Sequence, residues 1–398
     1  MTADYADYDH HALGATYESI YETWRELLGK CPIGHSKAHD GMWVVTGYEE
    51  SVGILRKPSA FSSYPASFPS FPQPNKMMPV ELDPPDHQRY RSMVAEPFSP
   101  KRALSYEKPL RKIVNRLIDD FIEDGHCDVF ETIGAPLPAM LATIFLGVPL
   151  DDATRMAGWI HTLVHETASR PEAAGEAVMS IYGYFGGLLA ERAGGDGDEL
   201  ISIIARAEVD GQKLTQEELL GFSLFLLLAS IDTSQKVIGS MFWRMANDPD
   251  LVARLVADPS AVPAAVEEFL RLYSPVIATR KVVEDTEVAG AELKAGDQVL
   301  LLLGAAGRDA RTFPDPEVFS LGRENSAKHL AFGDYIHKCL GIHIVRVELR
   351  VLLEEFLRRI PKFEAQPGAE SLWSNGQVQG VVKAPIRFPA GAREIPPG

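Results

Sequence analysis

The stretch from residue 215 to residue 247 constrains the fold more than any other part of the chain. Thr215 and Glu218 have the spacing of a capping box, in which each side chain binds a backbone N–H at the start of a helix. The helical pattern that follows runs up to Asp248-Pro249, which predicts a helix on the order of 45 Å at about 1.5 Å per residue. Its middle, Leu219–Ile231, is apolar nearly all round. We therefore expect this helix to run through the core.

Shorter elements surround this helix, and the sequence predicts a mainly α chain with a minor β region. The expected helices span Pro85–Phe98, Lys101–Asp124, Asp151–His165, Pro263–Tyr273 and Leu340–Ile360. The expected strands span Met42–Thr46, Thr286–Val288, Gln298–Leu303 and Val381–Phe388.

Two segments lack a regular pattern. Ser62–Pro79 holds five prolines among Phe and Met residues, and proline is excluded from helix interiors and central strands. The apolar content of this segment predicts a loop packed over an apolar surface or a ligand. Arg192–Glu199 predicts a flexible surface loop. Neither segment is expected to divide the chain, so we expect residues 1–398 to form a single domain.

Charge and hydropathy exclude several classes of protein. The 398 residues include 39 basic and 55 acidic side chains, a net charge of −16, whereas nucleic-acid binding needs a basic surface. No apolar run reaches the roughly 18 residues of a membrane span, and the acidic N-terminus is the opposite of a secretory signal. The three cysteines indicate a reducing compartment without disulfides. We expect a cytoplasmic protein that binds neither nucleic acid nor a membrane.

Residues 331–341, with the sequence AFGDYIHKCLG, carry the strongest chemical signal. Cys339 lies in a tight loop just before a predicted helix, where the helix dipole and nearby donors stabilise a thiolate. A thiolate in this setting is a natural iron ligand. A buried structural cysteine is the alternative, but it explains neither Phe332-Gly333 before the cysteine nor Leu340-Gly341 after it. The sequence therefore predicts a metal ligand at Cys339.

Two pairs of polar residues interrupt apolar helices. Asp232 and Thr233 fall in the middle of the core helix, where burial is costly without a partner or a purpose. They predict a proton relay beside a ligand, a local helix kink in which Thr233 binds a carbonyl one turn earlier, or both. Glu268 and Arg271 share one helix face among apolar neighbours. This favours a partly buried charge network, with Arg323 as a further partner.

Histidines offer further candidates. His87 and Arg91 lie four residues apart on one helix face, which suits a carboxylate or phosphate ligand but also a solvated surface. Two other sets have spacings that suggest metal sites: Cys31, His35 and His39, and His161 with His165. Neither set has the four ligands of a structural zinc site or the Glu of a protease helix. We attribute both sets to loop polarity and a helix face.

Taken together, these motifs resemble the bacterial soluble cytochromes P450 and are similar to the camphor-hydroxylase group, in the same order along nearly the whole chain. The resemblance implies the cytochrome P450 fold, with a haem between the long central helix and the helix that follows Cys339. It matches Ala229–Ser234 to the oxygen-activation segment of the central helix. The residues it places around the haem are Cys339 as the axial thiolate, Phe332, Gly333 and Gly341 in its loop, Ala229 on the central helix, and His87, Arg91, Arg280 and His337 at the propionates.

The resemblance also implies an activity. The chain would be a haem-thiolate monooxygenase that inserts one oxygen atom from O2 into a small hydrophobic metabolite, by hydroxylation or epoxidation, with haem b (iron protoporphyrin IX) as cofactor. Asp232 and Thr233 would deliver protons on the distal side. Electrons would come from a ferredoxin and a ferredoxin reductase, docked at a basic patch of Arg89, Lys338 and Arg346. The expected walls of the substrate pocket are Phe68, Phe71, Met77, Met78, Leu224, Leu228, Val276, Ile277 and Val378.

Two positions depart from the family pattern. Tyr335 replaces a glycine of the cysteine loop, so its backbone must adopt an allowed conformation or accept strain. Ser230 replaces a glycine beside the oxygen-binding groove, where its hydroxyl would bind oxygen or water, or tighten the helix. These departures keep two alternatives open. One is an atypical haem-thiolate oxidant that uses peroxide or couples substrates, and the other is a haem-binding protein without turnover.

Overall fold

The predicted core helix is α10, which spans Gln216–Ala246. It belongs to a computed structural model that describes residues 3–5, 8–12, 16–70, 73–167 and 169–394. The Thr215 hydroxyl accepts a hydrogen bond from the Glu218 N–H, and the Glu218 carboxylate accepts one from the Thr215 N–H, at 3.3 and 2.7 Å. The capping box is therefore confirmed.

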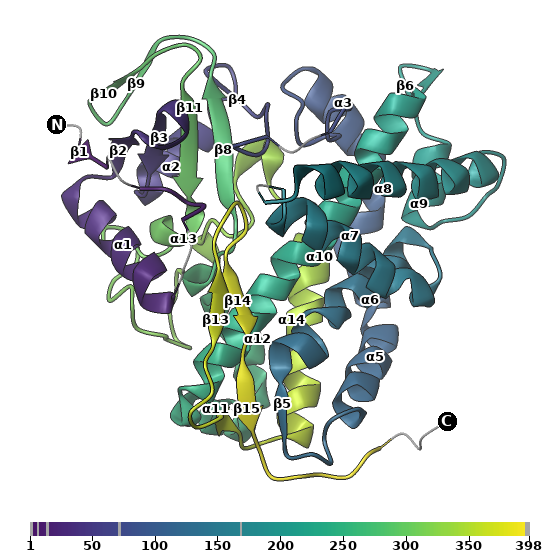
Figure 1. The fold of residues 1–398 in the computed structure, drawn as a ribbon, viewed down its shortest axis with the longest axis vertical. Coiled ribbons are helices and arrows are strands. Elements are labelled where there is room, and N and C mark those ends of the chain that lie inside the picture. The colour runs from purple at the N-terminus through teal and green to yellow at the C-terminus, as the bar shows by residue number, and fades with distance from the viewer. Residues whose placement is uncertain (1–2, 6–7, 13–15, 71–72, 168, 395–398) are drawn as a thin grey trace.

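Helices make up most of the remaining structure, and the strands are short. Figure 1 shows α5 to α9 grouped on one side of α10 and the largest sheet on the other. The other α-helices are α1 (Tyr17–Lys30), α2 (Tyr48–Leu55), α3 (Asp86–Met93), α4 (Pro100–Ser105), α5 (Glu107–Asp119), α6 (Pro136–Leu146), α7 (Ala153–His165), α8 (Pro171–Arg192), α9 (Leu200–Ala205), α11 (Pro249–Ala257), α12 (Val262–Leu272), α13 (Leu303–Ala306) and α14 (Ile342–Arg359). The strands are β1 (Ala3–Asp4), β2 (Ile33–Ser36), β3 (Met42–Val45), β4 (Phe61–Ser62), β5 (His126–Asp128), β6 (Glu208–Val209), β7 (Gln212–Lys213), β8 (Ile277–Val282), β9 (Thr286–Val288), β10 (Ala291–Leu293), β11 (Gln298–Leu302), β12 (Glu364–Ala365), β13 (Leu372–Ser374), β14 (Gly380–Lys383) and β15 (Pro385–Arg387).

The core forms around α10, which packs against α6, α8 and β14. Phe222, Leu227 and Phe242 of this helix are fully buried. The Phe242 ring lies 4.5 Å from that of Phe356 on α14, a distance typical of favourable aromatic pairs. The apolar middle of α10 therefore lies in the core, as its sequence predicts.

The largest sheet has the strand order β1-β2-β3-β11-β8-β4. β11 pairs in parallel with β3 and antiparallel with β8, which sets Val299 opposite Arg280. Successive side chains of a strand point to opposite faces. Arg280 is accordingly only 8% exposed, while its neighbour Lys281 is exposed. β8 thus directs one arginine into the molecule.

Most of the expected elements are present, but two long helices are divided. The helix expected over Pro85–Phe98 ends at Met93 and is followed by a 3-10 turn, because Pro97 lacks the N–H that would continue it. The helix expected over Lys101–Asp124 is split into α4 and α5 at Tyr106. Pro109 is tolerated there because it falls in the first turn of α5.

The proline-rich segment Ser62–Pro79 is irregular beyond β4 over its described residues, as predicted. Its anchor is Glu81, which is 2% exposed. The Glu81 carboxylate accepts hydrogen bonds from the N–H groups of Ala66 and Met77, at 3.0 and 2.7 Å. Phe71, one of the expected pocket walls, lies outside the described residues.

The predicted charge network at Glu268 is present and fully buried. Arg271 binds both carboxylate oxygens of Glu268 at 2.8 Å, and Arg323 binds one of them at 2.9 Å. Burial raises the pKa of the Glu268 carboxyl, but the hydrogen bonds from the two arginines outweigh it and hold the pKa below its usual value. Arg271 also donates to the Gly307 carbonyl. The network therefore fixes α12 to the segments around residues 307 and 323.

The loop before α14 keeps a glycine-like backbone at Tyr335. The φ angle of Tyr335 is +58°, in the left-handed region, and that of Gly333 is +65°. The Tyr335 side chain is 54% exposed. The tyrosine therefore follows the path that a glycine would take and directs its ring to the surface. A non-glycine residue in this conformation costs about 1–2 kcal/mol.

This conformation yields a test of loop strain. We expect Tyr335→Gly to be more stable than Tyr335→Ala by about 1 kcal/mol, because only glycine relieves the left-handed strain. Thermal unfolding of both variants, followed by circular dichroism, measures the difference. At Val318, which is also exposed but has no positive φ, the order should reverse, since glycine there only adds freedom to the unfolded chain. Equal stability of the two Tyr335 variants would contradict the assignment of strain.

Candidate active site

Cys339 lies in the short loop that enters α14. Its N–H donates to the Phe332 carbonyl at 2.8 Å, and a Cβ on Gly341 would lie 3.8 Å from the Cys339 Sγ. Burial raises the pKa of the Cys339 thiol, while the Gly341 N–H and the cations of Arg91 and Arg346 lower it to a smaller extent. The helix start alone therefore does not hold a thiolate. A coordinated metal ion would, because it deprotonates the thiol that binds it.

Four side chains that can carry positive charge meet beside this loop. His87 and Arg91 come from α3, Arg280 from β8, and His337 from the loop itself. The rings of His87 and His337 are 4.1 Å apart, and the Arg91 guanidinium donates to the Lys338 carbonyl. We call these four residues the basic cluster. The structure thus brings together all four residues that were assigned to the haem propionates.

The protein balances only part of the charge of the basic cluster. The Asp83 carboxylate raises the pKa of His87 and of Arg280, but by less than burial lowers it. Burial and the neighbouring cations lower the pKa of His87 to about 4 and that of His337 to about 2, and burial lowers the pKa of Arg280 to about 10. Among the described residues, none of the four forms a salt bridge, and the His87 Nε2 is buried without a hydrogen-bond partner. Such a cluster is suited to an anionic group with carboxylates.

The middle of α10 has one accessible face. Ala229 is exposed and Thr233 is half-buried, although most residues around them are buried. The Thr233 hydroxyl donates to the Ala229 carbonyl at 2.9 Å. The Ser230 hydroxyl donates to the Leu226 carbonyl at 2.7 Å, so it tightens the helix, which was one of its two expected roles. A small residue and a hydroxyl on this face leave room for a ligand beside α10.

Asp232 faces a different environment from Thr233. It is 2% exposed, and its Oδ1 lies 2.8 Å from the His165 Nε2 and 3.1 Å from the Lys236 Nζ. Burial raises the pKa of the Asp232 carboxyl, but Lys236 and His165 overcome it and lower the pKa to about 2. The other carboxylate oxygen is buried without a partner among the described residues. Asp232 is therefore an ionised, buried carboxylate with one oxygen available.

The partners of Asp232 were not predicted from the sequence. His165 was attributed to a helix face, yet it contacts Asp232 across 67 positions of the chain. Lys236 is 2% exposed and lies one turn after Asp232 on α10. Its spacing of four residues was a readable signal for an ion pair. The contact of His165 with Asp232 has no such signal in the sequence, because it depends on how α7 packs against α10.

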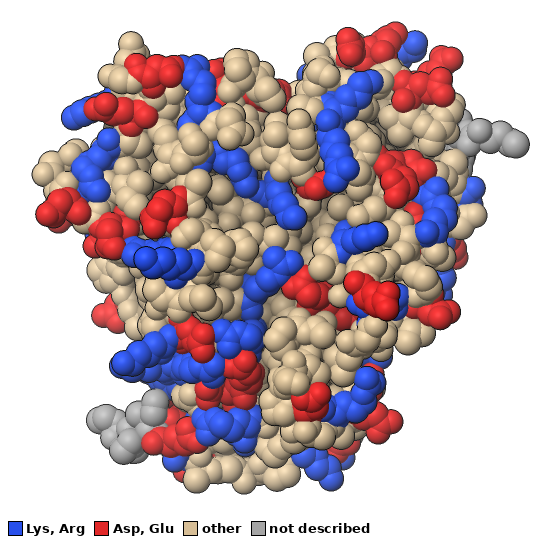
Figure 2. All heavy atoms as spheres, turned by 180° about the vertical axis from the view of Figure 1, so that it is seen from behind, with Lys and Arg blue, Asp and Glu red and all other residues tan. Residues whose placement is uncertain are grey.

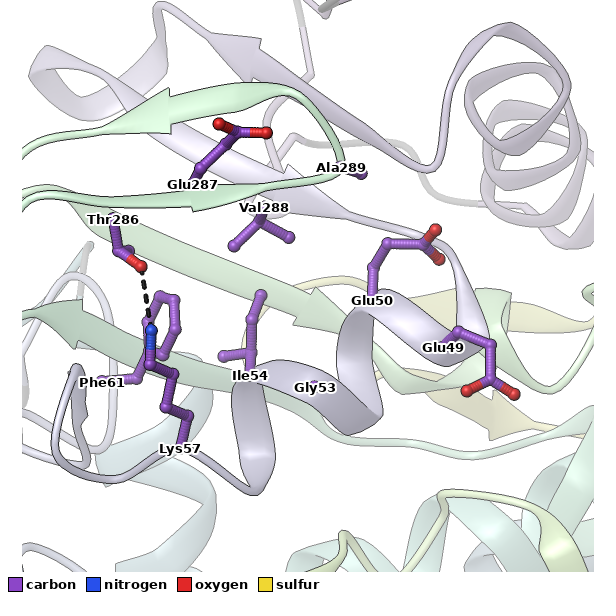
Figure 3. Close-up of a pocket in the computed structure, with 10 residues that line it drawn as sticks. All are labelled: Glu49, Glu50, Gly53, Ile54, Lys57, Phe61, Thr286, Glu287, Val288 and Ala289. Atoms are coloured by element: carbon purple, nitrogen blue, oxygen red, sulfur yellow. Dashed lines mark hydrogen bonds between the residues drawn. The ribbon is translucent and has the colours of Figure 1, made fainter.

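A surface hollow of about 350 Å³ lies between α2 and the β9–β10 hairpin (Figure 3). Within it, the Lys57 Nζ donates to the Thr286 Oγ1 at 3.2 Å. No residue of the cysteine loop or of the basic cluster lines this hollow, so we assign it no part in the chemistry. Its lining residues are Glu49, Glu50, Gly53, Ile54, Lys57, Phe61, Thr286, Glu287, Val288 and Ala289.

The helices also bear on the predicted absence of a membrane span. Within the described part of the chain, no helix combines the length and the apolar character that crossing a bilayer requires.

Comparisons with known proteins identify the family. The model of the cytochrome P450 family matches residues 196–388. The cytochrome P450 monooxygenase PikC of Streptomyces venezuelae is 32% identical over 396 residues, covering 96% of this chain and 94% of that protein. The mycinamicin IV hydroxylase/epoxidase of Micromonospora griseorubida is 31% identical, covering 95% of each.

Solved structures give the same result. The crystal structure of CYP101J2 has a TM-score of 0.85 and 26% identity, and covers 96% of each chain. A mutant of P450 EryK in complex with erythromycin B has a TM-score of 0.85 and 28% identity, and covers 95% of this chain and 98% of that one. These likenesses extend over nearly the whole chain, and the cysteine loop matches the motif from which the family was expected. The chain belongs to the cytochrome P450 family and is a P450 oxidoreductase.

Proposed function

We propose that this protein is a haem b monooxygenase that inserts one oxygen atom from O2 into a small hydrophobic metabolite, with electrons from a ferredoxin and its reductase. The observation that carries the proposal is the combination of the Cys339 thiol with a cluster of two arginines and two histidines that forms no salt bridge among the described residues. Haem b fits both, because its iron takes a thiolate ligand and its two propionates are anions. We infer that the catalytic machinery lies in one domain, since its residues come from α3, α10, β8 and the loop before α14.

The residues have distinct roles in holding the cofactor. Cys339 would bind the iron, and Phe332, Gly333 and Gly341 shape the loop around its sulfur. His87, Arg91, Arg280 and His337 would bind the propionates, which accounts for the unpartnered His87 Nε2. Ala229 leaves space at α10. The haem supplies activation of O2, so that one oxygen atom enters the substrate and the other leaves as water.

Proton delivery would begin from the Asp232 cluster. His165 is 15% exposed at its side chain and lies next to His161, which is 65% exposed. A proton taken up there can reach the Asp232 carboxylate through the 2.8 Å contact. Thr233 would lie next to the reaction centre, because its hydroxyl is on the accessible face of α10. It can pass a proton from its Oγ1 and take one back.

The proposed substrate is a hydrophobic metabolite. Phe68, Leu228 and Val276 are half-buried apolar residues of the expected pocket wall, whereas Met77, Leu224 and Ile277 are buried in the core. The names of the relatives report different compounds. One relative is a mycinamicin IV hydroxylase/epoxidase, and one solved structure is a complex with testosterone. An apolar wall with few polar groups suits a substrate of this general kind.

Docking of a ferredoxin would use basic side chains on the cysteine side. Figure 2 shows a band of Lys and Arg side chains running through the middle of one face. Of the expected patch, Arg89 pairs with Asp86 and Arg346 with Glu267. Part of its charge is thus neutralised, so the attraction for an acidic partner would depend strongly on salt. We place the reaction in the cytoplasm, together with such a partner.

The axial ligand is tested by replacing the cysteine. We expect Cys339→Ser to lose the carbon-monoxide difference spectrum of a thiolate-bound haem, because a hydroxyl does not replace the thiolate as a ligand. Cys31→Ser is the matched control and should keep the spectrum. A variant at Cys339 with an unchanged spectrum would contradict the assignment. Conversion of substrate in step with NAD(P)H consumption, supported by a surrogate reductase, would exclude a haem-binding protein without turnover.

The basic cluster makes a second prediction. Arg280→Met should release haem faster, because a buried propionate loses a charge-assisted hydrogen bond worth about 1.5–3 kcal/mol. This corresponds to a roughly 10–100-fold higher rate of haem transfer to apomyoglobin. Lys281→Met, at the exposed neighbouring position of β8, should leave the rate unchanged. Equal rates in the two variants would remove Arg280 from the propionate site.

The hydroxyl on α10 separates a monooxygenase from a peroxide user. In Thr233→Ala we expect hydrogen peroxide to rise and product to fall by on the order of a hundredfold, the lower end of the range for a lost proton-transfer group. Ser230→Ala should change coupling little, since the Ser230 hydroxyl is bound within the helix. The atypical oxidant would be favoured if Thr233→Ala changed neither the peroxide-driven turnover nor the coupling of electron consumption to product formation.

A further inference from the structure

A second group of metal-binding side chains lies at the start of the chain, outside the site described above. β1 pairs with β2 and brings residues 8–12 beside the 3-10 turn Ala38–Asp40, which contains His39. The segment is held in place, because the Gly376 N–H donates to the His10 carbonyl at 2.7 Å and the Asn375 Nδ2 donates to the Ala12 carbonyl at 2.7 Å. The side chains of residues 9–11 are therefore positioned by the fold.

Three residues of this region converge. One ligand atom from each of Asp9, His10 and His39 lies within 4.8 Å of the other two. The Asp9 Oδ1 is 2.8 Å from the His39 Nε2, and it also accepts the His11 N–H at 2.8 Å. The sequence pattern grouped His39 with Cys31 and His35. The fold instead places His39 against a carboxylate and an imidazole from the segment that follows β1, the strand next to β2.

His10 shows the arrangement of a histidine that binds a metal. It is 1% exposed, and its Nε2 lies 2.7 Å from the Phe68 carbonyl. A carbonyl only accepts, so the Nε2 must carry the proton and donate it. The Nδ1 then holds the lone pair, and it is buried without a hydrogen-bond partner in the described structure. Metal-bound histidines commonly donate their other N–H to a backbone carbonyl in this way.

A further imidazole stands beside these three residues. The His11 ring lies 4.2 Å from that of His10 and 5.8 Å from that of His39. The His11 Nε2 is also buried without a partner among the described residues. Two unpartnered ring nitrogens in one small region are costly unless something binds them. They are an observation independent of the contact between Asp9 and His39.

The donor set selects the kind of ligand. Imidazole nitrogens with one carboxylate suit Zn²⁺ and similar transition metals, whereas Mg²⁺ and Ca²⁺ prefer oxygen ligands. Bonds of about 2.0–2.2 Å in tetrahedral geometry place ligand atoms about 3.4 Å apart. The ion would replace the hydrogen bond between Asp9 and His39, whose atoms lie 2.8 Å apart, and would require the three ligand atoms to adjust from their present spacing of up to 4.8 Å.

We propose that Asp9, His10 and His39 form a binding site for one divalent transition-metal ion of the Zn²⁺ class, with the His11 ring beside it. This site is separate from the iron at Cys339 and does not depend on the proposed function. Through the hydrogen bond from His10 to the Phe68 carbonyl, the ion would also fix the loop Ser62–Pro79.

The test uses the haem-loaded full-length protein without a polyhistidine tag, after dialysis against a chelator. Titration calorimetry with Zn²⁺, and elemental analysis of zinc and iron after gel filtration, should give one zinc ion per chain. We expect Asp9→Asn and His39→Ala each to weaken zinc binding by more than the roughly 10–100-fold that loss of an outer-shell partner costs. Mg²⁺ should give no binding at the same concentration.

His35→Ala is the matched control, because His35 is exposed on β2 and its ring contacts Trp43 rather than the cluster. It should bind zinc as the parent protein does. Asp9→Asn changes no side-chain volume, so it keeps the test valid if His39→Ala folds poorly. The carbon-monoxide spectrum reports an intact fold in each variant. Failure of the parent protein to bind zinc, or equal affinity in Asp9→Asn and His35→Ala, would overturn the proposal.

Discussion

The cost of burying charge governs the interior of this protein. An ion moved out of water loses several kcal/mol of solvation even after relaxation, and only opposite charge or hydrogen bonds make up for that loss. At Glu268 the compensation is complete, because two arginines bind the carboxylate and a third interaction comes from the Ser320 N–H. At Asp232 it comes from Lys236 and His165. The Glu268 cluster is closed, whereas one oxygen of Asp232 has no partner among the described residues. Each cluster joins elements that are distant in sequence.

The basic cluster is the exception to this rule. Its two arginines and two histidines lie side by side, and in the described structure they have backbone and hydroxyl hydrogen-bond partners but no salt bridge, with Asp83 as a nearby carboxylate. The neighbouring Cys339 lacks sufficient positive charge to hold a thiolate, because burial opposes its thiolate form. One group that carries both a metal ion and carboxylates removes both costs at once. Cofactor binding and folding stability are therefore linked here, because whatever binds the native state alone stabilises it.

Local sequence patterns predicted the features that depend on neighbours along the chain. The capping box at Thr215, the ion pair of Glu268 and Arg271, and the loop at Cys339 each lie within about one or two helical turns. The residues assigned to the haem site were predicted from the family resemblance. Their spacing in the sequence alone does not predict that they lie close together. The contact of His165 with Asp232 depends on the packing of α7 against α10, and that of Asp9 with His39 on the pairing of β1 with β2. No periodicity in the sequence encodes such contacts.

The predicted helix boundaries were wrong for a related reason. The apolar pattern runs on through Tyr106, yet the chain divides into α4 and α5 there. A proline three residues further is compatible with either a kink or a new helix start, and the sequence alone does not decide between them. Tyr335 shows the opposite case, in which a residue that seldom adopts a positive φ follows the backbone path expected of glycine. The surrounding loop determines this conformation, and the side chain accommodates it at the surface.

The loop Ser62–Pro79 joins these separate parts of the molecule. The Glu81 carboxylate accepts two backbone N–H groups of this loop and so helps to set its shape. Near its start, Ser63 contacts His337 of the basic cluster. Further along, Phe68 accepts the hydrogen bond of His10. The same loop is thus attached to the proposed haem site at one point and to the proposed metal site at another. The loop therefore contributes one hydrogen-bonding residue to each proposed site, Ser63 to the haem site and Phe68 to the metal site.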